Sequence, residues 1–281
     1  MIKELLDQLV VYDVLNYTKI RLGNNYDGGY VIMNKAFKYS KIYSFGIGND
    51  ISFEANFVVN QPCEIYLCDP TIYKLPFNIS WFHFKKVGLK GIEISSSLKN
   101  KFLKLLYDKV LFDKTLKNRF FNFLNNRLKV KISSQICFDT LENHLLKDGN
   151  IDDQNMFLKM DIEGDEYSAI LKTPIEILKK FNQIIIEVHY IGDNEFLNIE
   201  KQLLFFKKMN KNHRIIHVHH NNCSEIKLID GFKVPNVLEV TFLKKDKKFV
   251  FVKSKASFPT VLDFPNNIDQ KDIPLDFYPF E

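Results

Sequence analysis

Short apolar runs alternate with amphipathic segments along most of this chain. Runs of four to eight apolar residues predict buried strands, and apolar positions repeating every three to four residues predict helices. The N-terminal residues 2–18 have the helical pattern. Strands are predicted at 30–33, 41–48, 63–69, 80–89, 156–161, 183–190 and 213–219, and helices at 50–60, 140–149, 165–180 and 194–210.

This alternation predicts an α/β fold. Strands separated by helices form a mostly parallel sheet with helices on both faces. The later apolar runs 237–243 and 249–254 follow without a helix between them and predict an antiparallel terminal hairpin. Such an ending is typical of nucleoside-dependent methyltransferases rather than nicotinamide dehydrogenases. We predict a seven-stranded sheet in one domain, 1–281, with an N-terminal helical extension at 1–20, a helical insertion at 95–129 and an irregular tail.

Charge and cysteine content narrow the possible partners. The 39 basic and 34 acidic residues give a net charge of only +5, which argues against nucleic acid and is compatible with an anionic small molecule. The four cysteines have no metal-binding spacing, so we expect buried thiols and a reducing cytoplasm. No apolar stretch is long enough to span a membrane, and the N-terminus has no signal-peptide core.

A glycine turn follows the strand at 41–48. Gly46 and Gly48 lie between a strand and a helix, where glycine lets a ligand approach the backbone closely. The dinucleotide fingerprint requires a third glycine, but Ile51 occupies its place, which disfavours a pyrophosphate cradle. About twenty residues on, a strand ends at Asp69, whose carboxylate can bind a ribose diol. A nucleoside without pyrophosphate points to S-adenosylmethionine.

Three later strands end in polar residues. Asp161 ends the run FLKMD, and this places its carboxylate at the carboxyl edge of the sheet, where open α/β sheets bind ligands. Glu163 is a weaker candidate, whereas Asp165 and Glu166 are explained as favourable charges in the first turn of the next helix. We expect His189 and His219 to reach the same edge.

These residues allow two roles. A histidine held by a carboxylate could act as general base toward a substrate hydroxyl. Alternatively, Asp161, His189 and His219 could hold a divalent metal that acidifies this hydroxyl. Mixed imidazole and carboxylate ligands suit Fe, Mn, Zn or Co better than Mg or Ca.

The combination of motifs resembles the FkbM-like methyltransferases, in particular a branch with a DGGY segment before the glycine turn. The motifs are, in order, RLGNNYDGGYVI, YSFGIGNDISFE, YLCDPT, LKMDIEGDE, IIIEVHYI, HVHHNN and VLEVTFL. The resemblance implies a Rossmann-like methyltransferase fold, S-adenosylmethionine as methyl donor and, usually, O-methylation of a sugar.

By motif position, the resemblance also implies roles for individual residues. Gly46, Gly48 and Asp69 would line the cofactor, and Asp161 would lie near the transferred methyl group. The segment Asp27, Gly28, Gly29 and Tyr30 would close over the cofactor. Ser44 stands where the wider methyltransferases have an acid, which leaves the contact to the methionine ammonium unassigned.

We therefore expect a cytoplasmic S-adenosylmethionine-dependent O-methyltransferase. Its expected acceptor is a hydroxyl of a sugar or sugar nucleotide used for surface polysaccharide. Two alternatives remain at this point: a nicotinamide-dependent oxidoreductase or epimerase, and a non-catalytic glycan- or partner-binding module of the same fold.

Overall fold

The computed structural model describes residues 1–48, 50–69, 130–133 and 140–281, the segment 130–133 by its backbone alone. The helices are α1 (Ile2–Asp7), α2 (Ser52–Asn60), α5 (Leu141–Lys147), α6 (Glu166–Lys172), α7 (Ile175–Leu178) and α8 (Ile199–Asn212). The strands are β1 (Tyr12–Val14), β2 (Lys19–Leu22), β3 (Tyr30–Met33), β4 (Lys41–Phe45), β5 (Glu64–Cys68), β6 (Val130–Ser133), β7 (Met156–Met160), β8 (Phe181–Val188), β9 (His213–His220), β10 (Ile226–Ile229), β11 (Phe232–Pro235), β12 (Leu238–Lys244) and β13 (Phe251–Lys253).

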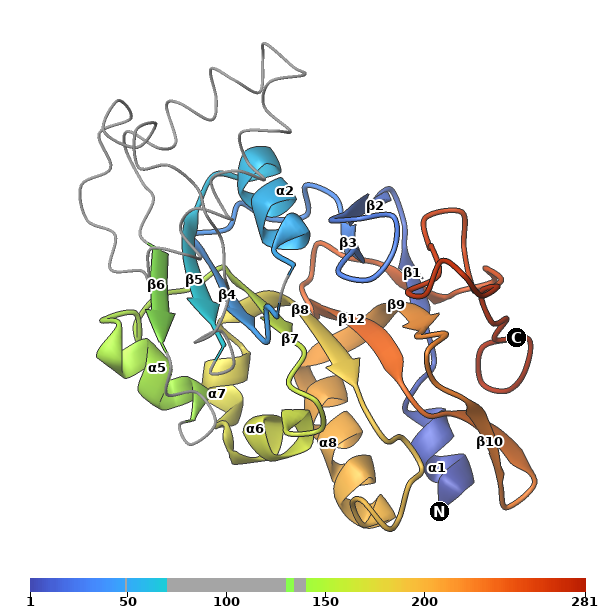
Figure 1. Ribbon diagram of the computed structural model, residues 1–281. Helices are drawn as coiled ribbons and strands as arrows, with labels where there is room; N and C mark the ends of the chain where they lie inside the picture. Colours follow the sequence, from blue (N-terminus) through green and yellow to red (C-terminus); the bar gives the residue numbers. More distant parts are fainter. Residues whose placement is uncertain (49, 70–129, 134–139) are drawn as a thin grey trace.

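A seven-stranded sheet organises the molecule, in the order β6-β5-β4-β7-β8-β12-β9 (Figure 1). Strands β6, β5, β4, β7 and β8 are parallel to one another. Strand β12 runs antiparallel to both of its neighbours, β8 and β9. This is the Rossmann-like methyltransferase fold, with a mostly parallel sheet, and it confirms the predicted fold class.

Each face of the sheet packs against its own layer. Alternate residues of a strand point to opposite faces. Ile184 and Ile186 pack in a core with α1, α6 and α8, whereas Ile185 packs in a second core with α2 and β3. In Figure 1, α5, α6, α7 and α8 lie below the sheet, and α2 lies above it with β2 and β3. The strands are therefore almost wholly apolar until their carboxyl ends.

The closing antiparallel strands pair differently from the predicted hairpin. Strand β12 enters the sheet between β8 and β9, and β13 instead pairs with β1. A separate hairpin, β10–β11, lies in the chain between β9 and β12 and was not predicted from the sequence. A hydrophobic run indicates a strand but not its partner, because pairing depends on distant parts of the chain.

Several element boundaries also differ. The N-terminal helix ends at Asp7 rather than at residue 18, and Tyr12–Val14 forms a strand instead. The predicted helix 165–180 is divided at Pro174, which lacks the N–H that a helix interior needs. The predicted strand 80–89 and the predicted helical insertion 95–129 lie outside the described residues. The strand beside β5 is β6.

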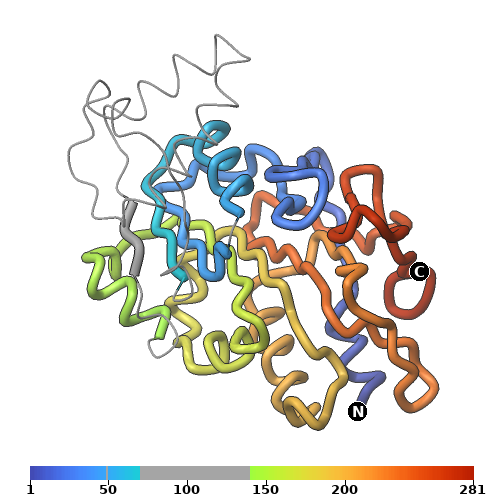
Figure 2. Tube along the Cα trace, in the orientation of Figure 1, coloured from blue at the N-terminus to red at the C-terminus, as the bar shows by residue number. Residues whose placement is uncertain are grey.

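The C-terminal tail is irregular, as predicted, and lies beside the loop between β2 and β3 (Figure 2). Two histidines of β9 hold it: His217 contacts Asp263 at 2.8 Å, and His219 contacts Asp272 at 2.9 Å. Cys63, Cys68 and Cys223 are free thiols, the first two buried. None of the helices in the described ranges has the length and apolarity needed to cross a membrane.

Candidate active site at the carboxyl edge of the sheet

Four strands present polar residues in one row at the carboxyl edge of the sheet. Phe45 pairs with Met160 and Met160 with Ile186, so the residues after them, Gly46, Asp161 and Glu187, come next in register. On the other side, Glu187 pairs with Glu239, and Glu239 with His219. The row therefore holds three carboxylates between a glycine and a histidine.

The glycine turn and Asp69 lie together, as predicted. The backbone N–H of Gly48 donates a hydrogen bond to Asp69 Oδ2 at 2.8 Å. Gly46 has a φ of +71°, and a Cβ at this position would lie 1.5 Å from the carbonyl oxygen of Asp161. Only glycine fits there, so the turn is pressed against the strand that carries Asp161.

A buried acid that the sequence analysis did not identify lies behind this turn. Ser44, which stands where the wider methyltransferases have an acid, donates its hydroxyl hydrogen bond to the carboxylate of Glu54 on α2. Lys159 lies 3.7 Å from the same carboxylate and donates to the carbonyl of Gly46 at 2.9 Å. Burial opposes the charge of Lys159, but Glu54 and Asp161 outweigh it and raise the pKa of the ammonium. The only signal in the sequence was that Glu54 is the single charged residue of α2.

Asp161 lies between this lysine and the rest of the acidic row. The hydroxyl of Tyr30 is 3.5 Å from Asp161 Oδ2, and the Tyr30 ring packs under the Lys159 ammonium. Burial raises the pKa of the Asp161 carboxyl to about 6, and the charges of Lys159 and His189 hold it from rising further. A carboxyl pKa raised by burial toward neutral pH is typical of functional sites.

His189 lies beside Asp161, as predicted, and is oriented by an unexpected partner. Its Nδ1 is 3.0 Å from Oε1 of Glu166, which is fully buried and also accepts a hydrogen bond from the backbone of Ile162. The interpretation of Glu166 as a mere helix-start charge is therefore wrong. Burial disfavours the charged imidazole, but Glu166 outweighs it and raises the pKa of His189. Glu163, whose side chain is 84% exposed, lies 3.5 Å from Nε2.

Glu187 is the most buried carboxylate of the row. Its side chain accepts a hydrogen bond from Asn221 at 2.8 Å, and Oε1 lies 3.8 Å from His189 Nε2. Burial, together with the charges of Asp161 and Glu239, raises its pKa well above the ordinary value. Glu187 was not among the residues predicted from the sequence to form the site.

His219 does not join Asp161 and His189, which corrects the predicted three-residue group. Strand β12 separates β9 from β8, so Glu239 lies between His219 and Glu187. Both ring nitrogens of His219 are already engaged, Nδ1 with Glu239 at 3.1 Å and Nε2 with Asp272 at 2.9 Å. In this structure His219 connects the tail to the sheet.

The DGGY segment lies over the same edge. Asp27 approaches Glu187 and Glu239, with one oxygen of each within 4.8 Å of the others. Gly28 and Gly29 pack closely against Asp50 and Arg21, leaving no room for a Cβ. Asp27 thus belongs to the acidic row, and Tyr30 contacts Asp161.

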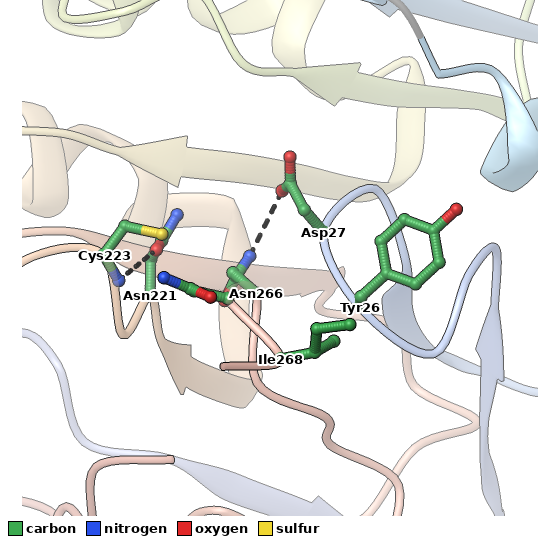
Figure 3. Close-up of a pocket in the computed structure, with 7 residues that line it drawn as sticks. Tyr26, Asp27, Asn221, Cys223, Asn266 and Ile268 are labelled. Carbon is green, nitrogen blue, oxygen red and sulfur yellow. Dashed lines mark hydrogen bonds between the residues drawn. The ribbon is translucent and has the colours of Figure 1, made fainter. Parts of the chain in front are cut away.

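An open pocket of about 380 Å³ adjoins this row. Its lining residues are Tyr26, Asp27, Asn221, Cys223, Asn266, Asn267 and Ile268. Figure 3 shows the amide of Asn266 turned toward Asp27, to which it donates at 3.3 Å. Asn266 also donates to Glu239 at 2.7 Å. The pocket is therefore bordered by amides and acids and is continuous with the carboxyl edge.

Comparisons with solved structures give low similarity. Precorrin-6y C5,15-methyltransferase from Geobacter metallireducens is 11% identical, with a TM-score of 0.34, over 74% of this chain and 81% of that one. TrmK of M. capricolum, solved with S-adenosylhomocysteine, is 16% identical, with a TM-score of 0.32, over 76% and 64%. Similarity this low does not indicate a substrate. No curated protein gives a significant match.

A family model gives a direct assignment. The model described as the methyltransferase FkbM domain matches residues 30–214, which is more than half of the chain. The matched range contains the glycine turn, Asp69, Asp161 and His189. The chain therefore belongs to the FkbM family of S-adenosylmethionine-dependent methyltransferases.

Proposed function

We propose that this protein is a cytoplasmic O-methyltransferase that transfers the methyl group of S-adenosylmethionine to a hydroxyl of a sugar or sugar nucleotide. The acceptor would be a building block of a surface polysaccharide. The observation that carries the proposal is the contact between the turn at Gly46 and the strand end at Asp161, because it joins a nucleoside-type turn to an acid–base group.

The cofactor half of the site is supported by the glycine turn and Asp69. The exposed backbone of the turn can approach a nucleoside, and Asp69 is held there by the N–H of Gly48. The carboxylate can accept hydrogen bonds from a ribose diol. Glu54, buried behind the turn with Ser44 and Lys159, would support the turn from inside rather than contact the cofactor. The glycine turn and Asp69 would bind and orient the cofactor.

The acceptor half is supported by the pocket shown in Figure 3. Each asparagine amide offers both donors and an acceptor, which suits a ligand with several hydroxyls. The nearby acids, Asp27, Glu187 and Glu239, make this edge negative. We therefore infer that the sugar ring occupies the pocket and that any phosphate group of the acceptor lies away from these acids. The net charge of +5 on the whole chain would still favour a phosphorylated acceptor.

The transfer itself needs few protein groups. The acceptor oxygen attacks the methyl carbon, the carbon–sulfur bond breaks, and its electron pair remains on sulfur, which gives S-adenosylhomocysteine. The hydroxyl proton must leave in the same process. His189, oriented by Glu166, can take this proton as general base. Alternatively, Asp161 and His189 would hold a divalent metal, which would supply Lewis acidity to lower the pKa of the hydroxyl. The two arrangements differ in their requirement for metal.

Calorimetry with the full chain tests the cofactor class. We expect S-adenosylhomocysteine to bind and NAD to give no heat of binding. Tight NAD binding would favour the oxidoreductase or epimerase alternative, and binding of neither compound would favour a non-catalytic module.

Substitution of Asp161 tests the catalytic assignment. Asp161→Asn should abolish methyl transfer while the affinity for S-adenosylhomocysteine stays within a few fold of wild type, because the cofactor turn is unchanged. Asp165→Asn is the matched control, since Asp165 is exposed and makes no capping hydrogen bond through its side chain. Wild-type turnover of the Asp161→Asn variant would exclude the proposed role.

A further inference from the structure

Three potential metal ligands converge at the ends of β7 and β8. Asp161 and Glu187 are neighbours in the row, and His189 follows Glu187 on the same side of its strand. One donor atom from each residue lies within 4.8 Å of the other two. Two carboxylates and one imidazole therefore face a single small space.

The imidazole of His189 is oriented as a metal ligand would be. Glu166 occupies Nδ1, and this fixes the ring and leaves the lone pair on Nε2. Among the residues that the structure describes, none makes a hydrogen bond to Nε2: Glu163 Oε2 lies 3.5 Å from it and Glu187 Oε1 lies 3.8 Å from it. The residue is only 7% exposed. A buried carboxylate behind a histidine whose other nitrogen has no hydrogen bond is the common arrangement around protein-bound metals.

The charge of the row also favours a cation. Asp161 and Glu187 lie side by side, and Glu239 and Asp27 extend the negative charge on the far side of Glu187. The ammonium of Lys159 does not compensate this charge directly, because it donates to the carbonyl of Gly46 at 2.9 Å and lies 3.7 Å from Glu54. Buried carboxylates this close repel one another unless protons or a cation compensate them.

We propose that Asp161, Glu187 and His189 bind one divalent transition metal, with Glu166 as the positioning residue behind His189. The mixed donors favour Mn, Fe, Co or Zn over Mg and Ca. Three protein ligands leave coordination positions open, so the metal could bind the acceptor hydroxyl and lower its pKa. This role rests on the proposed O-methyltransferase function, but metal binding itself does not. The ligand set replaces His219 of the sequence prediction with Glu187.

The test uses Mn²⁺ and Co²⁺ added to the chelator-treated full chain, without cofactor or acceptor. We expect one equivalent of Mn²⁺ to bind, detected by electron paramagnetic resonance of the free ion. Co²⁺ should give visible absorption bands that report nitrogen coordination. Glu187→Gln and His189→Gln should each weaken binding at least about tenfold, and Glu166→Gln about 10–100-fold, as expected for loss of a group that orients a ligand.

Two controls separate a lost site from a lost fold. His219→Gln should keep wild-type metal affinity, because both of its ring nitrogens contact other residues. Each variant is also titrated with S-adenosylhomocysteine, whose turn lies on β4. Absence of Mn²⁺ and Co²⁺ binding to wild type, or binding unaffected by Glu187→Gln and His189→Gln, overturns the metal site. If S-adenosylhomocysteine still binds, the proposed function stands; loss of its binding to wild type would instead refute the function.

Discussion

The backbone of Gly46 passes so close to that of Asp161 that no side chain fits between them. A Cβ on Gly46 would lie 1.5 Å from the carbonyl oxygen of Asp161. The amide of Asp161 in turn donates to the carbonyl of Phe45, at 3.0 Å. The glycine turn and the acidic row are thus fixed to each other through backbone atoms. A substitution that displaces the backbone of the turn should therefore also displace the backbone of Asp161.

Alanine at the two glycines of the turn should therefore have different effects. Gly46→Ala combines a φ of +71° with a backbone clash, so we expect a loss of at least about 2 kcal/mol in the free energy of unfolding. Gly48→Ala has a φ of +48°, but within the described residues nothing lies within 4 Å of its Cβ. This variant should fold with only about 1 kcal/mol of strain and bind S-adenosylhomocysteine at least about tenfold more weakly.

Urea unfolding and calorimetry measure these two outcomes separately. Equal stability losses in the two variants would contradict the packing argument. Unchanged S-adenosylhomocysteine affinity in a folded Gly48→Ala variant would show that the open side of the turn does not face the cofactor.

The buried pair behind the turn gives a second prediction. Lys159→Met removes the cationic partner of Glu54, which is 1% exposed and keeps its hydrogen bond from Ser44. Because a buried charge is then left without its counter-charge, the free energy of unfolding should fall by about 3–5 kcal/mol. Lys179→Met is the matched control, because the Lys179–Glu176 pair is exposed and should contribute at most about 1 kcal/mol.

A double variant distinguishes lost pairing from lost packing. Glu54→Gln removes the charge that Lys159→Met leaves behind, so the combined variant should be more stable than the Lys159→Met variant alone. If the two losses simply add in urea titrations, the ion pair contributes nothing and the effect of Lys159→Met is one of side-chain volume.

Local patterns predicted most of the sheet and the contact between the glycine turn and Asp69. The periodicity of strands and helices depends only on short stretches of sequence, and Gly46 and Gly48 indicate a turn because glycine readily adopts a positive φ. The pairing of β12 could not be predicted in this way. The predicted group of Asp161, His189 and His219 requires β8 and β9 to be adjacent, but Leu238–Lys244 enters between them. His219 was assigned to the wrong neighbours for this reason.

Besides strand pairing, the burial of individual acids could not be predicted from the sequence. Glu166 stands at a helix start, where an acid is usually exposed and favourable, yet it is fully buried behind His189. Glu54 has the same ambiguity on α2. A surface acid and a buried acid can have the same local sequence. Whether the side chain is buried depends on how elements distant in the chain pack against it.

The contact of His219 with the tail predicts a pH dependence of stability. Burial alone would lower the pKa of His219, but Glu239 and Asp272 outweigh it and raise the pKa to about 10, from an ordinary value of 6.5. A pKa raised by folding stabilises the native state fully below the unfolded value, and this stabilisation is lost as the pH rises through the folded value. Between pH 6.5 and 10, the contribution of His219 should fall by at most about 1.4 kcal/mol per pH unit.

The comparison with His219→Gln isolates this contribution from those of other groups. The difference in unfolding free energy between wild type and variant, measured in urea, should be largest near pH 6.5 and shrink toward pH 10. Hydrogen exchange at 266–272 should be faster in the variant, because His219 Nε2 holds Asp272 at 2.9 Å. A pH-independent difference would mean that the ring is neutral in the folded protein and that the tail is held by hydrogen bonds rather than by charge.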